Sequence, residues 1–284
     1  MDMQLIAKVK LPFEEDRLWI EAVRPWLESQ GVRGNALAVA NWVTTEMLNN
    51  VRDHSGSPEV EVLGLVSPKD FVIHIVDTGV GLFHRLAMGL GLAGPREAVI
   101  EVSKGKRTTD PEHHTGQGIF FSSKLCEWFC IEANGFAASF VSEDGANGAT
   151  NERAKPLEFL NPSSAGTTIK FRVALDAQRT LRTVFDEYCP QPDINFSKTV
   201  IGLRLMVEAD GSLISRSQGR RLMAGLEQFE DVTLDFGGVA EIGQGFADEV
   251  FRVWRNAHTA IRLRAVNANA EVSAMLRHAG ISAT

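Results

Sequence analysis

The stretch Asn41-Trp-Val-Thr-Thr-Glu-Met-Leu-Asn-Asn-Val-Arg-Asp-His54 predicts a helix in which polar and apolar side chains share one face. Five apolar residues form a broad stripe at helical spacing: Trp42, Val43, Met47, Leu48 and Val51. At about 100° per residue, Glu46, Asn50 and Asp53 fall on that same face. Burying a carboxylate or an amide costs free energy unless a partner satisfies it. Two interpretations remain open: a core helix with satisfied polar groups, or a helix that meets a polar ligand at Glu46 and Asn50.

Two glycine motifs follow this helix. Val76-Asp-Thr-Gly-Val-Gly81 ends an apolar run that we expect to form an antiparallel strand pair, residues 60–66 and 71–76. Asp77 at a strand end is a hydrogen-bond acceptor of fixed direction, and Gly79 and Gly81 let the backbone approach a ligand closely. A simple Asx turn has the same local sequence.

The second motif is His114-Thr-Gly-Gln-Gly-Ile-Phe-Phe121, which opens a predicted helix over residues 119–129. Backbone N–H groups of Gly116, Gln117 and Gly118 would bind an anion at the start of that helix. A polar segment without apolar period precedes it and contains the basic residues Lys104, Lys106 and Arg107. A mobile lid over a ligand and a plain solvated loop both fit this segment.

Together, the three motifs resemble the nucleotide site of the GHKL ATPases, most closely the anti-sigma-like branch, over about residues 10–175. The resemblance implies a Bergerat-type α/β sandwich, a mixed sheet with helices on one face, that binds ATP and Mg²⁺. It implies that Glu46 acts as the catalytic base and Asn50 as the Mg²⁺ ligand, with Asp53 beside them. Asp77 would accept from the adenine amino group, and one of Lys104, Lys106 and Arg107 would meet the γ-phosphate. Thr167, in a predicted strand, would reach adenine through water, although an ordinary strand threonine fits as well.

A second domain follows the proline-rich stretch Cys189-Pro-Gln-Pro-Asp193, so we expect domains at residues 1–188 and 195–284. Strands at 199–207, 232–236 and 261–266 alternate with helices at 215–229, 245–255 and 271–278, which predicts a small α/β domain. Residues 232–252 resemble the central strand, loop and helix of STAS domains, and more closely a STAS-like domain of unknown function. STAS domains have a phosphorylatable serine after the central strand, whereas residues 241–247 contain neither serine nor threonine.

Composition limits the class of protein. The 284 residues are 44% hydrophobic and 23% charged, as in soluble proteins, and the net charge of −7 argues against general nucleic-acid binding. We find no signal-peptide pattern and no long apolar span, and expect a cytoplasmic protein that does not bind membranes.

Three functions compete on these grounds. The first is a slow ATPase that acts as a nucleotide-controlled regulatory switch through its STAS-like domain. The second is a serine/threonine kinase of the anti-sigma type acting on a separate STAS-type partner, and the third is an ATP-gated binding module with negligible turnover. A protein partner and a homodimer are both compatible with the sequence, which identifies neither.

Overall fold

The computed structural model describes residues 2–106, 116–144, 150–154, 157–160, 165–189, 196–207 and 211–278. The chain divides into two compact units. The first consists of Met1–Val102, Lys106–Glu152 and Glu158–Val184. The second consists of Ser103–Gly105, Arg153–Leu157 and Phe185–Thr284. The α/β class expected from the sequence is confirmed.

The first unit is built on one eight-stranded sheet in the order β1-β2-β3-β8-β4-β5-β6, with β7 paired to β5. The strands are β1 (Gln4–Lys10), β2 (Glu59–Val66), β3 (Asp70–Asp77), β4 (Trp128–Ala133), β5 (Phe136–Asp144), β6 (Thr150–Ala154), β7 (Glu158–Phe159) and β8 (Thr167–Ala174). Each strand pairing that the structure describes residue by residue in this sheet is antiparallel. The sequence analysis expected a mixed sheet, and for these strands that expectation was wrong. Short hairpin turns join β2 to β3 and β4 to β5, and such turns produce antiparallel neighbours.

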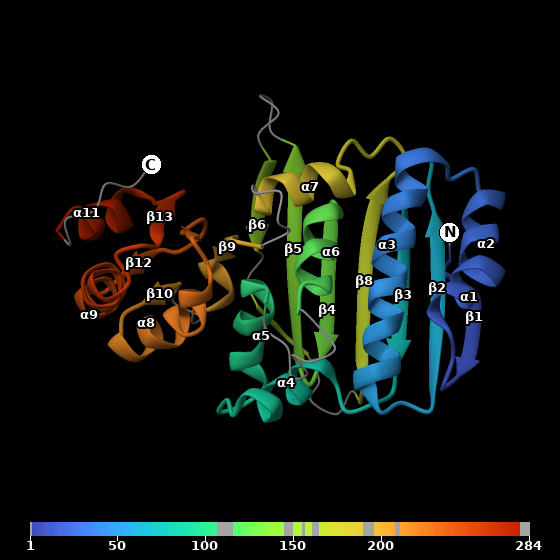
Figure 1. Cartoon of the computed structure of the whole chain (residues 1–284), viewed down its shortest axis with the longest axis horizontal. Helices are drawn as coiled ribbons and strands as arrows, with labels where there is room; N and C mark the ends of the chain where they lie inside the picture. Colours follow the sequence, from blue (N-terminus) through green and yellow to red (C-terminus); the bar gives the residue numbers. More distant parts are fainter. Residues whose placement is uncertain are drawn as a thin grey trace. The chain divides into compact units, whose positions relative to one another are not determined.

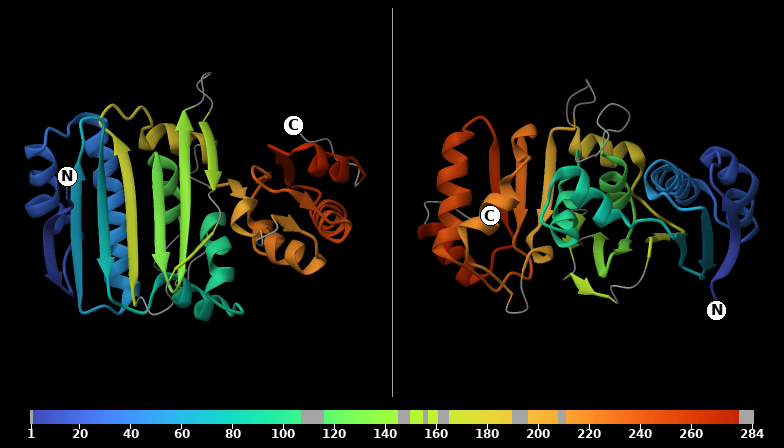
Figure 2. Two further views of the ribbon diagram at one scale, coloured as in Figure 1. Left: turned by 180° about the vertical axis from the view of Figure 1, so that it is seen from behind. Right: turned by 90° about the horizontal axis from the view of Figure 1, so that it is seen from below.

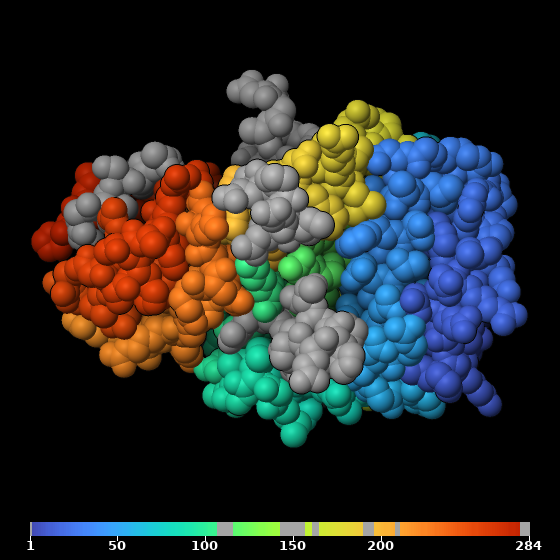
Figure 3. All heavy atoms as spheres, viewed as in Figure 1, coloured from blue at the N-terminus to red at the C-terminus, as the bar shows by residue number. Residues whose placement is uncertain are grey.

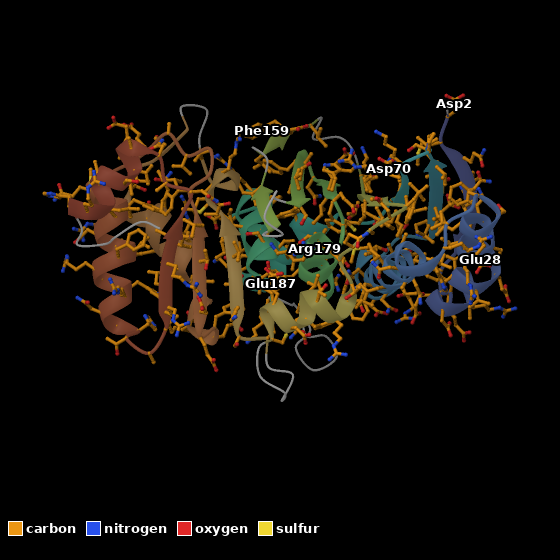
Figure 4. All side chains as sticks on the ribbon, turned by 90° about the horizontal axis from the view of Figure 1, so that it is seen from above. Asp2, Glu28, Asp70, Phe159, Arg179 and Glu187 are labelled. Carbon is orange, nitrogen blue, oxygen red and sulfur yellow. The ribbon has the colours of Figure 1, made fainter. Side chains whose placement is uncertain are left out.

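Helices pack on one face of this sheet, as Figure 1 shows for α2, α3 and α6. The helical segments are α1 (Glu15–Leu18), η1 (Trp19–Val23), α2 (Arg24–Ser29), α3 (Gly34–Asn50), η2 (Val51–Ser55), α4 (Leu82–Leu90), α5 (Pro95–Lys104), α6 (Gly118–Leu125) and α7 (Leu181–Tyr188). Figure 3 shows this side in space-filling form, and the left view of Figure 2 shows the strands from the opposite side. Figure 4 labels Glu28, whose carboxylate accepts from Arg24 at 3.0 Å on the exposed surface of α2.

The core lies between the helices and the sheet. Alternate residues of β3, Phe71, Ile73 and Ile75, are buried against the helical layer, while the residues between them are half-buried on the other face. Arg179, also labelled in Figure 4, ties the layers together by donating to Ser142 Oγ at 2.6 Å and to the carbonyl of Lys124.

Two helix boundaries predicted for the first unit change. The central helix begins at Gly34 instead of Asn41, because residues 36–40, Ala-Leu-Ala-Val-Ala, continue the apolar pattern with strong helix formers. The helix predicted over 119–129 ends at Leu125, and Trp128 and Phe129 belong to β4, where they pair with β8. A short run of apolar and aromatic residues does not distinguish a helix end from a strand start.

The second unit has the alternating order predicted from the sequence. Its strands and helices are β9 (Lys198–Gly202), η3 (Leu203–Leu205), β10 (Ser212–Leu213), α8 (Arg216–Met223), η4 (Leu226–Gln228), β11 (Asp231–Asp235), β12 (Glu241–Ile242), α9 (Gln244–Asp248), η5 (Glu249–Trp254), α10 (Arg255–Ala257), β13 (Arg262–Val266) and α11 (Ala270–His278). β11 lies between β9 and β13 and is parallel to both, and β10 pairs with β12 in a separate parallel pair. The strand predicted over 199–207 is shorter, and the helix predicted over 215–229 ends at Met223.

Candidate functional site

A pocket in the first unit brings the three sequence motifs together. It contains about 1010 Å³ of empty space, part of it open to solvent. The residues that line it come from α3, η2, the β3–α4 region, α5, the start of α6 and β8: Glu46, Met47, Asn50, Val51, His54, Ser55, Asp77, Gly81, Leu82, Arg85, Leu86, Val102, Gly116, Gly118, Ile119, Thr167 and Ile169.

Glu46 and Asn50 project into the pocket one helical turn apart on α3. Both are half-buried, whereas Val43, Met47 and Leu48 of the same helix are buried in the core. The side-chain nitrogen of Asn50 lies 3.9 Å from Met47 Sδ, to which it donates, so the amide oxygen remains available to the pocket. The polar groups on the apolar face thus border a hollow instead of the packed core.

The end of the helix departs from α-helical geometry in a way that changes which residues line the pocket. Residues Val51–Ser55 form a π-helical turn, which adds one residue to the turn. His54 and Ser55 therefore line the pocket, while Asp53 does not, although a regular helix would align it with Glu46 and Asn50. The Asp53 carboxylate accepts from Arg52 Nε at 2.8 Å.

Asp77, the last residue of β3, lines the pocket and is buried. Its Oδ1 accepts from the N–H of Gly79 at 2.8 Å, and Thr167 donates to it from its N–H and its hydroxyl. Burial raises the pKa of this carboxyl, although these hydrogen bonds oppose the shift. The Thr167 hydroxyl also accepts from the N–H of Leu82 at 2.9 Å, so it links the strand end to the start of α4.

Glycines permit close contacts around these side chains. A Cβ on Gly118 would lie 2.2 Å from Glu46 Oε2, and a Cβ on Gly166 would lie 1.9 Å from the carbonyl oxygen of Asp77. Gly166 also has a φ of +83°, a backbone conformation that residues other than glycine rarely adopt. Gly79 is outside the lining and packs against the backbone of Ser55, where a Cβ would lie 2.0 Å from the carbonyl oxygen.

Asn134 holds the loop that contains Gly81. Its side-chain nitrogen donates to the carbonyl of Val80 at 3.0 Å, and its oxygen accepts from the N–H of His84 at 3.0 Å. Gly81 leaves space for this amide, since a Cβ there would lie 2.4 Å from Asn134 Oδ1. The loop between β3 and α4 is therefore fixed by hydrogen bonds.

The three basic residues expected near a γ-phosphate have different positions. Lys104 is completely buried and belongs to the second unit, where its Nζ donates to the carbonyls of Arg221 at 3.0 Å and Ala224 at 2.8 Å. Lys106 is described but does not line the pocket, and Arg107 lies outside the described residues. Gln117 precedes α6 and is also outside the lining.

Among the described residues, three polar lining residues were missed by the sequence interpretation: His54, Ser55 and Arg85. His54 faces the pocket because of the π-helical turn, for which the sequence has no clear signal. Arg85 could have been found, because it follows Leu82 by three residues and precedes Leu86 by one. On a helix these three residues share a side, and all three line the pocket.

The first unit is thus an antiparallel sheet covered by helices, with a pocket lined by polar and apolar residues, and the second is a small α/β domain with a parallel sheet. Residues 218–273, within the second unit, match the model of the STAS-like domain of unknown function (DUF4325), which confirms the predicted class of the C-terminal domain. A comparison with curated proteins gives no match. Among the described residues, no helix is long and apolar enough to cross a membrane.

Proposed function

We propose that the first unit binds Mg-ATP and hydrolyses it slowly, as a GHKL-type ATPase, and that nucleotide state regulates the protein through its STAS-like domain. The observation that carries this proposal is the convergence of Glu46, Asn50, Asp77, Gly118 and Thr167 on one pocket. These residues come from four segments far apart in the sequence. Asp77 supplies a hydrogen-bond acceptor for the adenine ring, and Asn50 supplies an oxygen ligand for Mg²⁺. Gly118 leaves space for phosphates to approach the backbone.

Asp77 and Thr167 are suited to the adenine end of the ligand. In its ionised form the Asp77 carboxylate is an acceptor, which matches the amino group of adenine but not the carbonyl oxygen at the same position of guanine. The hydrogen bonds from Gly79 and Thr167 fix its direction. Because Asp77 is buried, leaving its carboxylate without a donor costs free energy, whereas a hydrogen bond from the adenine amino group is favourable. This position therefore favours adenine.

Asn50 and Glu46 are suited to the phosphate end. Mg²⁺ prefers hard oxygen ligands and usually binds proteins through one or two side chains together with substrate phosphates, so the Asn50 oxygen fits this role. No cluster of three or more His, Cys, Asp or Glu side chains that could hold a metal occurs in the described part of the chain. Bound Mg²⁺ would neutralise charge on the phosphates.

Glu46 would act as the general base in hydrolysis. Its carboxylate would take a proton from a water whose oxygen forms the new bond to the γ-phosphorus. The bond from that phosphorus to the β–γ bridging oxygen breaks, and the electron pair leaves with ADP. The contact distance at Gly118 supports this role, because only glycine leaves the start of α6 this close to the carboxylate.

Water is favoured as the acceptor over the protein's own STAS-like domain. α9 begins after Gly243, and residues 241–247 offer no hydroxyl group. Phosphate transfer to a separate STAS-type partner remains the alternative.

Incubation of the full chain with γ-labelled ATP and Mg²⁺ tests the proposal. Free labelled phosphate is expected from the wild type, with a loss of about 10²–10⁴-fold in the Glu46→Gln variant. Binding of Mg-ATP should persist in that variant and weaken in Asn50→Ala. Label on an added STAS-type protein would establish the kinase alternative. ATP binding without release or transfer would establish the binding module, and absence of ATP binding would refute all three functions.

A further inference from the structure

Arg85 is a charged residue of the pocket to which the nucleotide-site motifs assign no role. It lies on α4, and its N–H donates to the carbonyl of Gly81 at 3.0 Å, so its backbone is anchored to the glycine loop. Its side chain is exposed and lines the pocket. Within the described residues, the guanidinium makes no hydrogen bond or ion pair.

The charges around the pocket make this position informative. Among the described residues that line the pocket there are two carboxylates, Glu46 and Asp77, and Arg85 is the one lysine or arginine. The guanidinium pairs with neither carboxylate. Lys104 is engaged with backbone carbonyls of the second unit. Of the pocket's described residues, Arg85 is therefore the one with a permanent positive charge to offer an anionic ligand.

We propose that Arg85 contacts the polyphosphate of the bound nucleotide and makes the pocket select phosphorylated ligands over the bare nucleoside. A guanidinium presents a planar set of donors that matches two phosphate oxygens at once, and it stays charged at all physiological pH values. The exposed position of Arg85 lets the side chain approach a phosphate without loss of an existing partner. This inference rests on the proposed function.

The test compares ATP and adenosine as ligands of the full chain by calorimetry. Arg85→Gln should weaken binding of Mg-ATP by about 10-fold or more, the usual effect of losing a hydrogen bond to a charged group. Adenosine affinity should change by less than about twofold, since Asp77 and Thr167 hold the base. Arg85→Lys should retain part of the ATP affinity because the charge remains.

Lys10→Gln is the matched control, because it removes one positive charge from an exposed residue outside the pocket lining. It should leave both affinities unchanged, and melting temperatures should show that all variants fold. Equal loss of ATP and adenosine affinity in Arg85→Gln would overturn the inference, because Arg85 would then only shape the pocket. Unchanged ATP affinity would also overturn it while leaving the proposed function intact. A wild type that binds neither ligand would refute the proposed function itself.

Discussion

Substitution of Gly118 tests whether Glu46 acts in catalysis or only supports the structure. Gly118→Ala would place a Cβ 2.2 Å from Glu46 Oε2, the mobile end of a side chain, so the carboxylate must move while the backbone need not. We expect ATP turnover to fall by at least about tenfold if Glu46 is the base. The free energy of unfolding should stay the same or rise by up to about 1 kcal/mol, because alanine favours helix over glycine.

Gly94→Ala is the control for this variant, since a Cβ at Gly94 meets nothing within 4 Å. Turnover assays and urea unfolding on both variants check the prediction. Equal turnover in Gly118→Ala and the wild type would contradict the role of Glu46.

The stability of the first unit should depend on His74 at mildly acidic pH. His74 lies on β3 opposite Lys170 of β8, and its pKa is lowered by burial and then by the charge of Lys170, with Glu132 opposing. The unfolded chain therefore takes up a proton near the ordinary pKa of about 6.5 while the folded chain resists it. The stabilising contribution is complete above that pH and is lost as pH falls through the lowered pKa.

Replacement by glutamine should reduce this pH dependence. The urea midpoint of the wild type should fall more between about pH 7.5 and 5.5 than that of His74→Gln, while His84→Gln at an exposed position should behave like the wild type. Identical pH profiles for wild type and His74→Gln would refute this assignment.

At the scale of elements, α3 and η2 show what a helical pattern predicts and what it misses. Apolar spacing correctly predicted the helix, and the polar residues on its apolar face drew attention to Glu46 and Asn50, which both line the pocket. The same projection grouped Asp53 with them, because it assumed 3.6 residues per turn to the end. The structure has a π-helical turn at Val51–Ser55, and the helical pattern of the sequence gave no sign of it.

The start of α8 offers a test of stability in the STAS-like unit. Ser215 Oγ accepts from the N–H of Gln218 at 3.2 Å, and Gln218 Oε1 accepts from the N–H of Ser215 at 2.8 Å, which forms a capping box. Ser215→Ala should lower the free energy of unfolding by about 1 kcal/mol. Exposed Ser217 is the control in thermal denaturation, because its hydroxyl lies 2.9 Å from the Ser215 hydroxyl but belongs to neither hydrogen bond of the box. Equal melting temperatures for Ser215→Ala and Ser217→Ala would contradict the capping role.

At the scale of the whole molecule, the sequence predicted two domains but not where every segment belongs. The proline-rich stretch after Tyr188 marked a change of composition, whereas the compact units divide at Val184 and Phe185. Ser103–Gly105 joins the second unit although it ends a helix that begins in the first. In the sequence, Lys104 looks like a basic residue of a lid, because it begins a polar segment. Only the structure shows that it donates to the carbonyls of Arg221 and Ala224 in the second unit.

Lys104 should therefore affect stability through the second unit. Lys104→Met removes the donor to the carbonyls of Arg221 and Ala224, and leaving buried acceptors unpaired costs about 1–3 kcal/mol. We expect a lower melting temperature than for Lys10→Met, which removes the same charge from an exposed site. A fully stable Lys104→Met protein with weakened ATP binding would contradict this assignment and return Lys104 to the nucleotide site.

The most direct test of the central claim is a calorimetric titration of the intact protein with Mg-ATP and with Mg-GTP. Saturable binding of one Mg-ATP per chain is expected. Mg-GTP should bind at least about 1–3 kcal/mol more weakly, because the buried Asp77 carboxylate would face the guanine carbonyl oxygen without a donor. Equal affinity for the two nucleotides would contradict the assignment of Asp77, and no binding of either would contradict the account of the pocket as a nucleotide site.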